Sequence, residues 1–167
     1  MPRYQLKYRI KTPLNNRRDI VLSYGRYDVC FLFANKQADD RDVFTTVEIE
    51  AENNLQAHML AMGHIIPHVL DAFSFTARSP MLLGEREMTL KAEQGQETRR
   101  GFCVLERKNA QPAPLDEEAA DRAQHILQSQ NGPTLPLCWQ RYAIDRSLVL
   151  ETFIFQWLAF EGLAGTT

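Results

Sequence analysis

His64 and His68 stand four residues apart in a segment with helical periodicity, the spacing at which two imidazoles can share one metal ion. Glu48, Glu50 or Asp71 could supply a third ligand, but no spacing in the sequence selects one of them. On a helical wheel both histidines lie opposite the apolar face, where exposed surface histidines are the simpler interpretation. The sequence therefore favours exposed histidines over a metal site, and no cofactor is predicted.

Arg122 and His125 are the other pair whose types could do chemistry. In RNA cleavage a histidine can activate the 2′-hydroxyl while an arginine stabilises the phosphorane. Both residues fall in an expected helix over 116–130, where a solvated helix face is the favoured interpretation. The chain contains no GxSxG motif, no P-loop and no GxGxxG motif after a strand. No catalytic residue is assigned, and the sequence favours a protein that is not an enzyme.

Composition limits the remaining classes of protein. The 167 residues have a formal net charge of −2 and are 44% hydrophobic and 24% charged, as in an ordinary globular domain. Three cysteines lie far apart without a CxxC pair, which indicates reduced, buried thiols: Cys30, Cys103 and Cys138. No segment has the length of a signal peptide's apolar region or the roughly 20 apolar residues of a membrane span. We therefore expect a cytoplasmic protein with no membrane partner.

Basic residues crowd the start of the chain. They are Arg3, Lys7, Arg9, Lys11, Arg17, Arg18 and Arg26. Solvated strand faces are the favoured interpretation. The alternative is a basic N-terminal edge at which Arg17 and Arg18 meet a phosphate backbone or an acidic partner.

The first half of the chain predicts an antiparallel sheet. Residues 3–11 alternate between apolar and basic, and 19–24 and 27–34 read as a hairpin around Gly25-Arg26, after a turn at 13–16. A polar loop over 35–42 should precede a further strand over 43–50. Phe44 is out of phase with Val47 and Ile49 there, which a bulge or a strand start at Thr45 would resolve. The tyrosines of these strands could stack bases, but core positions are favoured for them.

An amphipathic helix is predicted over 52–73, kinked where Pro67 cannot bond to the carbonyl of Gly63. His58 borders its apolar face and should be partly buried. That apolar face consists of Leu55, Met59, Met62, Ile66, Val69, Leu70 and Phe73.

The second half predicts a hairpin and then helices. Residues 82–92 and 100–107 should form a hairpin or an edge pair of strands, and a helix that Asp116 opens should end at Asn131-Gly132-Pro133. A last helical region over 135–163 should break near 145–147. The fold class is thus α+β: an antiparallel sheet packed on an amphipathic helix, followed by a C-terminal helical segment. The expected divisions are a sheet domain over 1–108, a linker over 109–114 and a helical segment over 115–167.

The end of that helical region is apolar in nearly every direction around its axis. Such a helix must be covered on all sides. The sheet and earlier helices, a second chain or a continuation of the protein could each cover it, and the sequence leaves these three alternatives open. If a partner covers it, Phe153, Trp157 and Phe160 should anchor the interface, because buried aromatic side chains dominate interface energies.

Two segments resemble a known family. The stretch LCWQRYAIDRSLVLETFIFQWLAFEGLAG resembles the opening helices of ApeA-like HEPN domains, in the outline of Trp139, Tyr142, Trp157, Phe160, Glu161 and Leu163. The stretch VEIEAENNLQAHMLAMGHIIPHVLDAFSF is similar to the region that precedes such helices in MauJ-like proteins. Together they cover somewhat over a third of the chain. The resemblance implies the amino-terminal part of such a protein, with a HEPN-type helical unit, a class that often dimerises and often cleaves RNA. The RxxxxH motif of that cleavage is absent, so no nuclease residue is carried over.

Two hypotheses of function follow. The first is a non-catalytic interaction or sensing module that forms a homo-oligomer or docks a protein partner through the apolar C-terminal helix. The second is a nucleic-acid-binding or RNA-processing, HEPN-type protein or subunit that uses the basic N-terminal edge. Binding that weakens steeply with salt would distinguish the second from the first.

Overall fold

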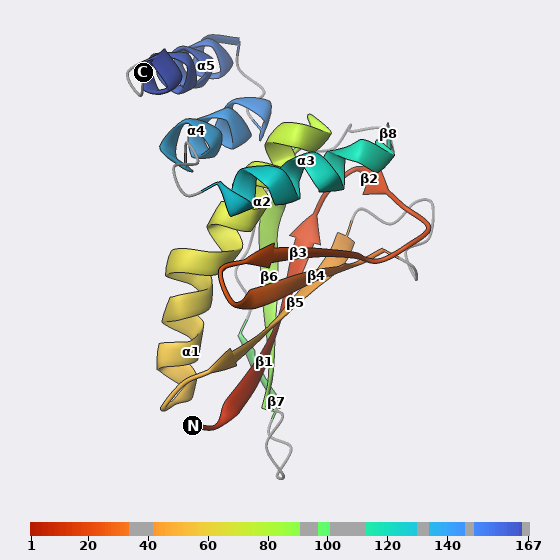
Figure 1. Ribbon diagram of the computed structural model, residues 1–167, viewed down its shortest axis with the longest axis vertical. Helices are drawn as coiled ribbons and strands as arrows, with labels where there is room; N and C mark the ends of the chain where they lie inside the picture. The colour runs from red at the N-terminus through yellow and green to blue at the C-terminus, as the bar shows by residue number, and fades with distance from the viewer. Residues whose placement is uncertain (34–41, 91–96, 101–112, 130–133, 146–148, 165–167) are drawn as a thin grey trace.

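The computed structural model describes residues 1–33, 42–90, 97–100, 113–129, 134–145 and 149–164 (Figure 1). Residues 35–41 of the expected loop, Cys103 and most of the expected strand over 100–107 lie outside the described residues. Asp42, the last residue of the expected loop, begins a strand instead.

An antiparallel sheet with the order β3-β4-β5-β1-β6-β7 holds the main strands of the described residues. Their bounds are β1 Arg3–Lys11, β3 Ile20–Tyr24, β4 Tyr27–Leu32, β5 Asp42–Glu50, β6 Leu82–Leu90 and β7 Glu97–Arg100. β1 is an interior strand, paired with β5 on one side and β6 on the other. The basic strand 3–11 is therefore not an edge of the sheet. The second hairpin is confirmed, but β7 begins at Glu97, earlier than predicted.

The inner face of the sheet is the apolar face that the alternation of residues 3–11 predicts. Tyr4, Leu6, Tyr8 and Ile10 are all buried, which confirms core positions for Tyr4 and Tyr8. Of the other two tyrosines expected in the core, Tyr24 and Tyr27 are half-buried and pack against its margin. On β5 the buried row runs through Val43, Thr45, Val47 and Ile49.

Phe44 faces outward, and the register of β5 with β1 is unbroken from Asp42 to Glu50. The predicted bulge or strand start at Thr45 was therefore wrong. An outward phenylalanine is stable here because the Lys7 ammonium lies 3.9 Å from the centroid of its ring.

The predicted turn at 13–16 contains a short strand instead. β2 (Leu14–Asn15) pairs in parallel with β8 (Ala113–Pro114). Leu14 is buried, and the Leu115 N–H donates to the Asn15 carbonyl at 3.1 Å. The burial of Leu14 thus outweighs the turn preference of its neighbours. The hydrogen bond from Leu115 connects the segment before the helix at Glu117 to the N-terminal strands.

The long amphipathic helix is interrupted where Pro67 predicts a kink. α1 (Asn54–Leu60) leads into a π-helical turn, η1 (Ala61–Ile65), and then α2 (Ile66–Ala77). The Ile66 N–H donates to the Ala61 carbonyl, one residue further back than in an α-helix.

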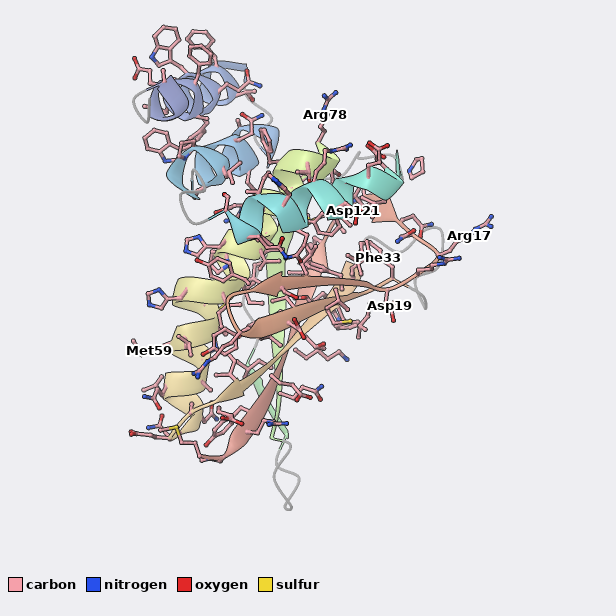
Figure 2. The ribbon with its side chains drawn as sticks, in the orientation of Figure 1. Arg17, Asp19, Phe33, Met59, Arg78 and Asp121 are labelled. Atoms are coloured by element: carbon pink, nitrogen blue, oxygen red, sulfur yellow. The ribbon has the colours of Figure 1, made fainter. Side chains whose placement is uncertain are left out.

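That extra residue rotates the face of α1 relative to α2, and the single apolar face predicted over 52–73 is wrong at its start. Leu55 and Met59 are 67% and 63% exposed, and the small side chain of Ala57 packs inward instead. Figure 2 shows Met59 extending away from the sheet. His58 is half-buried, as predicted, with its Nδ1 3.4 Å from the Tyr8 hydroxyl.

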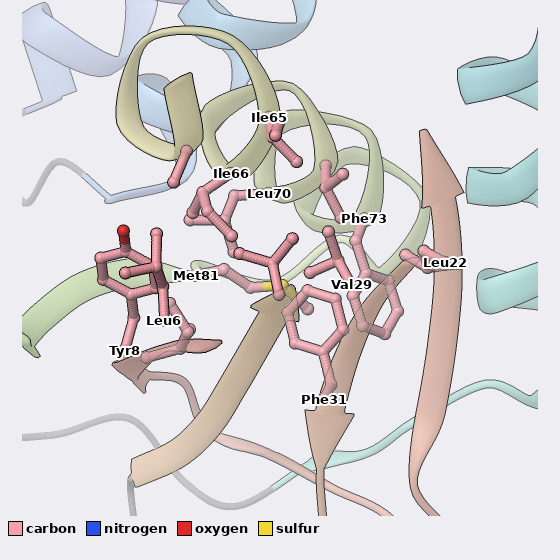
Figure 3. Close-up of a cluster of buried hydrophobic side chains, with 14 of the residues drawn as sticks. Leu6, Tyr8, Leu22, Val29, Phe31, Ile65, Ile66, Leu70, Phe73 and Met81 are labelled. Atoms are coloured by element: carbon pink, nitrogen blue, oxygen red, sulfur yellow. The ribbon is translucent and has the colours of Figure 1, made fainter. Parts of the chain in front are cut away.

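The core lies between the inner face of the sheet and α2 (Figure 3). Ile66, Val69, Leu70 and Phe73 supply the helical side, as predicted. The rings of Phe31 and Phe73 meet edge to face, with centroids 5.1 Å apart and planes at 72°.

Three further helices are described: α3 (Glu117–Gln128), α4 (Thr134–Asp145) and α5 (Val149–Ala164). α3 packs on α2 and β3, where the Gln124 amide accepts from the Ser23 N–H at 2.7 Å and donates to the Ser23 carbonyl at 3.0 Å. α4 packs on α2, and α5 packs on α4 at the far end of the molecule (Figure 1). The α+β fold is thus confirmed. The division at residues 109–114 stays a prediction.

Candidate functional site

A cluster of large apolar side chains is exposed on α5. Phe153, Ile154, Trp157 and Phe160 are 59%, 45%, 53% and 69% exposed, and we call these four residues the α5 surface. Soluble monomers rarely expose contiguous apolar groups of this kind without a function for them. Of the three ways to cover the helix, burial by the sheet and earlier helices is absent among the described residues.

Packing on α4 determines which side of α5 stays open. Ala159 is buried, and the half-buried Leu158 lies next to it in the sequence. Gly162 approaches α4 so closely that a Cβ there would lie 2.8 Å from Cγ of Pro136. The half-buried Phe155 and Leu158 thus lie on the same side of α5 as Ala159 and Gly162, and the α5 surface is left on the opposite side.

The α5 surface has the spacing of a helix-packing seam. Phe153, Trp157 and Phe160 follow one another at intervals of four and three residues, which places them along one stripe of the helix. The rings of Phe153 and Trp157 stack, with centroids 6.3 Å apart. Phe153, Trp157 and Phe160 are the interface anchors expected from the sequence, and that role stays a prediction. Ile154 is exposed beside them.

A buried ion pair holds α4 against α2. Arg141 Nε donates to Asp71 Oδ1, and the two side chains are 12% and 3% exposed. Burial raises the pKa of the Asp71 carboxyl, and the charge of Arg141 opposes that rise. The sequence carries no signal of this pair, because residues 70 positions apart show no local pattern of contact.

Cys138 lies one helical turn before Arg141. Burial raises the pKa of its thiol, and the charge of Asp71 adds to the rise. A thiol of this kind is a poor nucleophile, but Cys30 and Cys138 are half-buried, so the prediction that these thiols are buried was wrong. Burial also raises the pKa of Cys30.

The two histidines with metal-ligand spacing occupy different surroundings. His64 is exposed, as predicted. The predicted exposure of His68 was wrong, because its ring is half-buried with its centroid 5.4 Å from that of Tyr24. Within the described part of the chain, no group of three histidine, cysteine or carboxylate side chains could hold a metal ion. The structure thus brings no third ligand to His64 and His68 among these residues.

Arg17 and Arg18 are exposed in the connection between β2 and β3. β3 is an edge strand of the main sheet. The Asn16 side chain accepts from the Arg17 N–H and donates to the Arg18 carbonyl, so the backbone of this connection is held in place. Figure 2 shows Arg17 extending away from the body of the molecule.

No family model matches the chain, no curated protein matches its sequence and no solved structure matches its fold. None of the described helices is both long and apolar enough to span a bilayer.

Proposed function

We propose that the protein is a non-catalytic interaction module that self-associates through the α5 surface. The observation that carries this proposal is the exposure of four large apolar side chains on one side of a helix whose other side packs on α4. Water around such side chains is unfavourable by about 25 cal/mol for each Å² of apolar area, so a covering partner would be strongly favoured.

A second copy of the chain is the partner that fits this surface best. A stripe with intervals of four and three residues is complementary to a helix of the same kind, and a two-fold axis lets one surface pair with itself. Each copy contributes the two packed helices α4 and α5, so the pair would form a four-helix arrangement. Gln156 and the exposed Glu161 flank the stripe, which gives the apolar centre the polar rim of a typical interface.

The family resemblance supports the same proposal. The α4–α5 pair occupies the segment that resembles the opening helices of ApeA-like HEPN domains, and HEPN-type units often dimerise. We keep that family as a proposal, and we assign no nuclease residue because the RxxxxH motif is absent.

Trp157→Ala tests the proposal, with Leu55→Ala as the matched control. Both side chains are exposed apolar residues on a helix, but Leu55 lies on α1, away from α4 and α5. We expect Trp157→Ala to weaken self-association at least tenfold in sedimentation equilibrium, as removal of an interface anchor does. Leu55→Ala should leave it unchanged. Equal association of both variants and the unaltered protein would contradict the proposed surface.

The exposure of Arg17 and Arg18 beside an edge strand favours nucleic-acid binding as a second candidate. Phosphate contacts by arginine release counterions, so the affinity should fall steeply with salt. The replacement of both arginines by alanine should then weaken binding to single-stranded RNA and reduce the salt dependence. No binding at low salt would reject this candidate.

A further inference from the structure

A groove of about 1020 Å³ lies between the C-terminal end of α2, α3 and α4, away from the α5 surface. Phe75 and Arg78 come from the end of α2, Arg122, His125 and Ile126 from α3, and Gln140 from α4. The carboxylate of Asp116, the N-cap of α3, also lines the groove and pairs with Arg122. It is large enough for a small organic ligand, since such pockets commonly span several hundred to about 1000 Å³.

Arg78 occupies a backbone conformation that normally requires glycine. α2 ends in a Schellman motif: the Ser79 N–H donates to the Ser74 carbonyl and the Arg78 N–H to the Phe75 carbonyl, both at 3.2 Å. Arg78 therefore has a φ of 49°, in the left-handed region. It is the only residue other than glycine with positive φ among those described, and such strained residues concentrate at binding sites.

The charge of Arg78 is open to a ligand. None of the salt bridges among the described residues involves Arg78. Its side chain is exposed, and Figure 2 shows it extending beyond the end of α2. A guanidinium on a well-fixed backbone can donate two parallel hydrogen bonds to an anion.

A second guanidinium at the groove is held in place. Arg122 Nη2 donates to Asp116 at 2.5 Å, and Nη1 donates to Glu118 at 3.0 Å. The hydrogen bond from Arg122 is the main cause that keeps the pKa of the Asp116 carboxyl below its usual value, and the charge of Arg78 contributes to the same lowering. These carboxylates orient Arg122. His125, on the same helix, contributes its imidazole ring to the lining of the groove.

The rest of the groove suits an aromatic body. Phe75 is exposed although it belongs to the apolar part of α2, and Ile126 is half-buried. Gln140 offers an amide that can both donate and accept hydrogen bonds. An exposed phenyl ring beside cationic groups is the combination that binds a base and its phosphate together.

We infer that this groove binds an aromatic phosphate, of which a nucleoside monophosphate is the representative class. The phosphate lies at Arg78, with Arg122 and His125 as further donors, and the base packs on Phe75. The inference is independent of self-association through the α5 surface.

Isothermal titration with adenosine monophosphate, adenosine and inorganic phosphate tests this site in the full chain. We expect the monophosphate to bind at least tenfold more tightly than either part alone, because both ends of the groove then contribute. An aromatic carboxylate such as phenylacetate serves as a further probe. Tighter binding of phenylacetate than of the monophosphate would overturn the assignment of phosphate, and no binding of the monophosphate would overturn the site.

Arg78→Gly is the decisive variant, because glycine suits the left-handed backbone and removes only the side chain. We expect a tenfold or greater loss of affinity for the monophosphate with an unfolding temperature equal to or above that of the unaltered protein. Phe75→Ala should weaken the binding of the monophosphate but leave the binding of inorganic phosphate unchanged. Arg26→Ala is the matched control, because Arg26 is also exposed, lies in the turn between β3 and β4 and does not line the groove. It should leave the affinity unchanged; a loss with Arg26→Ala and none with Arg78→Gly would refute the inference.

Discussion

Removal of Arg141 should destabilise the protein more than any surface substitution, because it leaves the Asp71 carboxylate buried without its cation. The Asp71 side chain is only 3% exposed, so water cannot replace the lost partner. Breaking a buried ion pair from one side costs about 3–5 kcal/mol, and we expect Arg141→Ala to lie in that range. Asp71→Ala should cost less, about 1–3 kcal/mol, because the long side chain of Arg141 is 12% exposed and can turn its charge toward water.

The cost of Arg141→Ala should depend on pH. Without Arg141, burial raises the pKa of folded Asp71 further above the ordinary value of 3.8. Between that value and the raised pKa, folded Asp71 holds a proton that the unfolded chain has released. The free energy of unfolding therefore falls as the pH rises through this window, by up to about 1.4 kcal/mol per pH unit. The difference in the free energy of unfolding between Arg141→Ala and the unaltered protein should be smaller at about pH 4.5 than at about pH 7.

Urea unfolding followed by circular dichroism measures these differences. The matched control is the double variant Asp71→Leu with Arg141→Met, which replaces the pair by apolar side chains and should be far less destabilised than Arg141→Ala. A cost below about 1 kcal/mol for Arg141→Ala, or a cost that is the same at both pH values, would refute the account of this pair.

Three further predictions concern packing. Gly162→Ala should lower the free energy of unfolding by about 1–2 kcal/mol in urea denaturation, because its Cβ would meet Pro136, although alanine alone favours a helix. An unchanged or raised stability would show that α5 does not approach α4 so closely. Thr45→Val should stabilise by up to about 1 kcal/mol, since the buried Thr45 hydroxyl has no hydrogen-bond partner among the described residues. A loss of stability would reveal a partner for that hydroxyl. The Cys138 thiol should react slowly with a thiol reagent until the protein unfolds, because burial raises its pKa, and rapid labelling of the folded protein would contradict this burial.

Much of the sheet could be predicted because its signal is local. The alternation of residues 3–11 gave both the strand and its buried face, and Gly25 marked the turn between β3 and β4. The order of the strands could not be predicted in this way. β1 lies between β5 and β6, and that pairing depends on contacts between residues far apart in the sequence.

Errors arose where tertiary contacts outweighed a local pattern. Leu55 and Met59 match the period of a helix, but the π-helical turn at η1 changes the period and turns them outward. Phe44 breaks the alternation of β5 because Lys7 on the neighbouring strand packs over its ring. For Phe44 the decisive partner lies on a neighbouring strand, and for Leu55 and Met59 the change of period lies in the turn that follows them.

The candidate sites show the same division. The apolar character of α5 is a property of its sequence, so Phe153, Trp157 and Phe160 could be named in advance. The side of α5 that α4 covers could not be predicted from that sequence. The groove beside Arg78 gave no sequence signal, because its walls come from three helices and the left-handed backbone of Arg78 is not encoded by a glycine.

Light scattering of the unaltered protein across a range of concentrations tests the central claim most directly. Self-association through the α5 surface predicts a mass of twice the 19.2 kDa chain at high concentration, which falls toward a single chain on dilution or with Trp157→Ala. A mass of one chain at every concentration would contradict the claim.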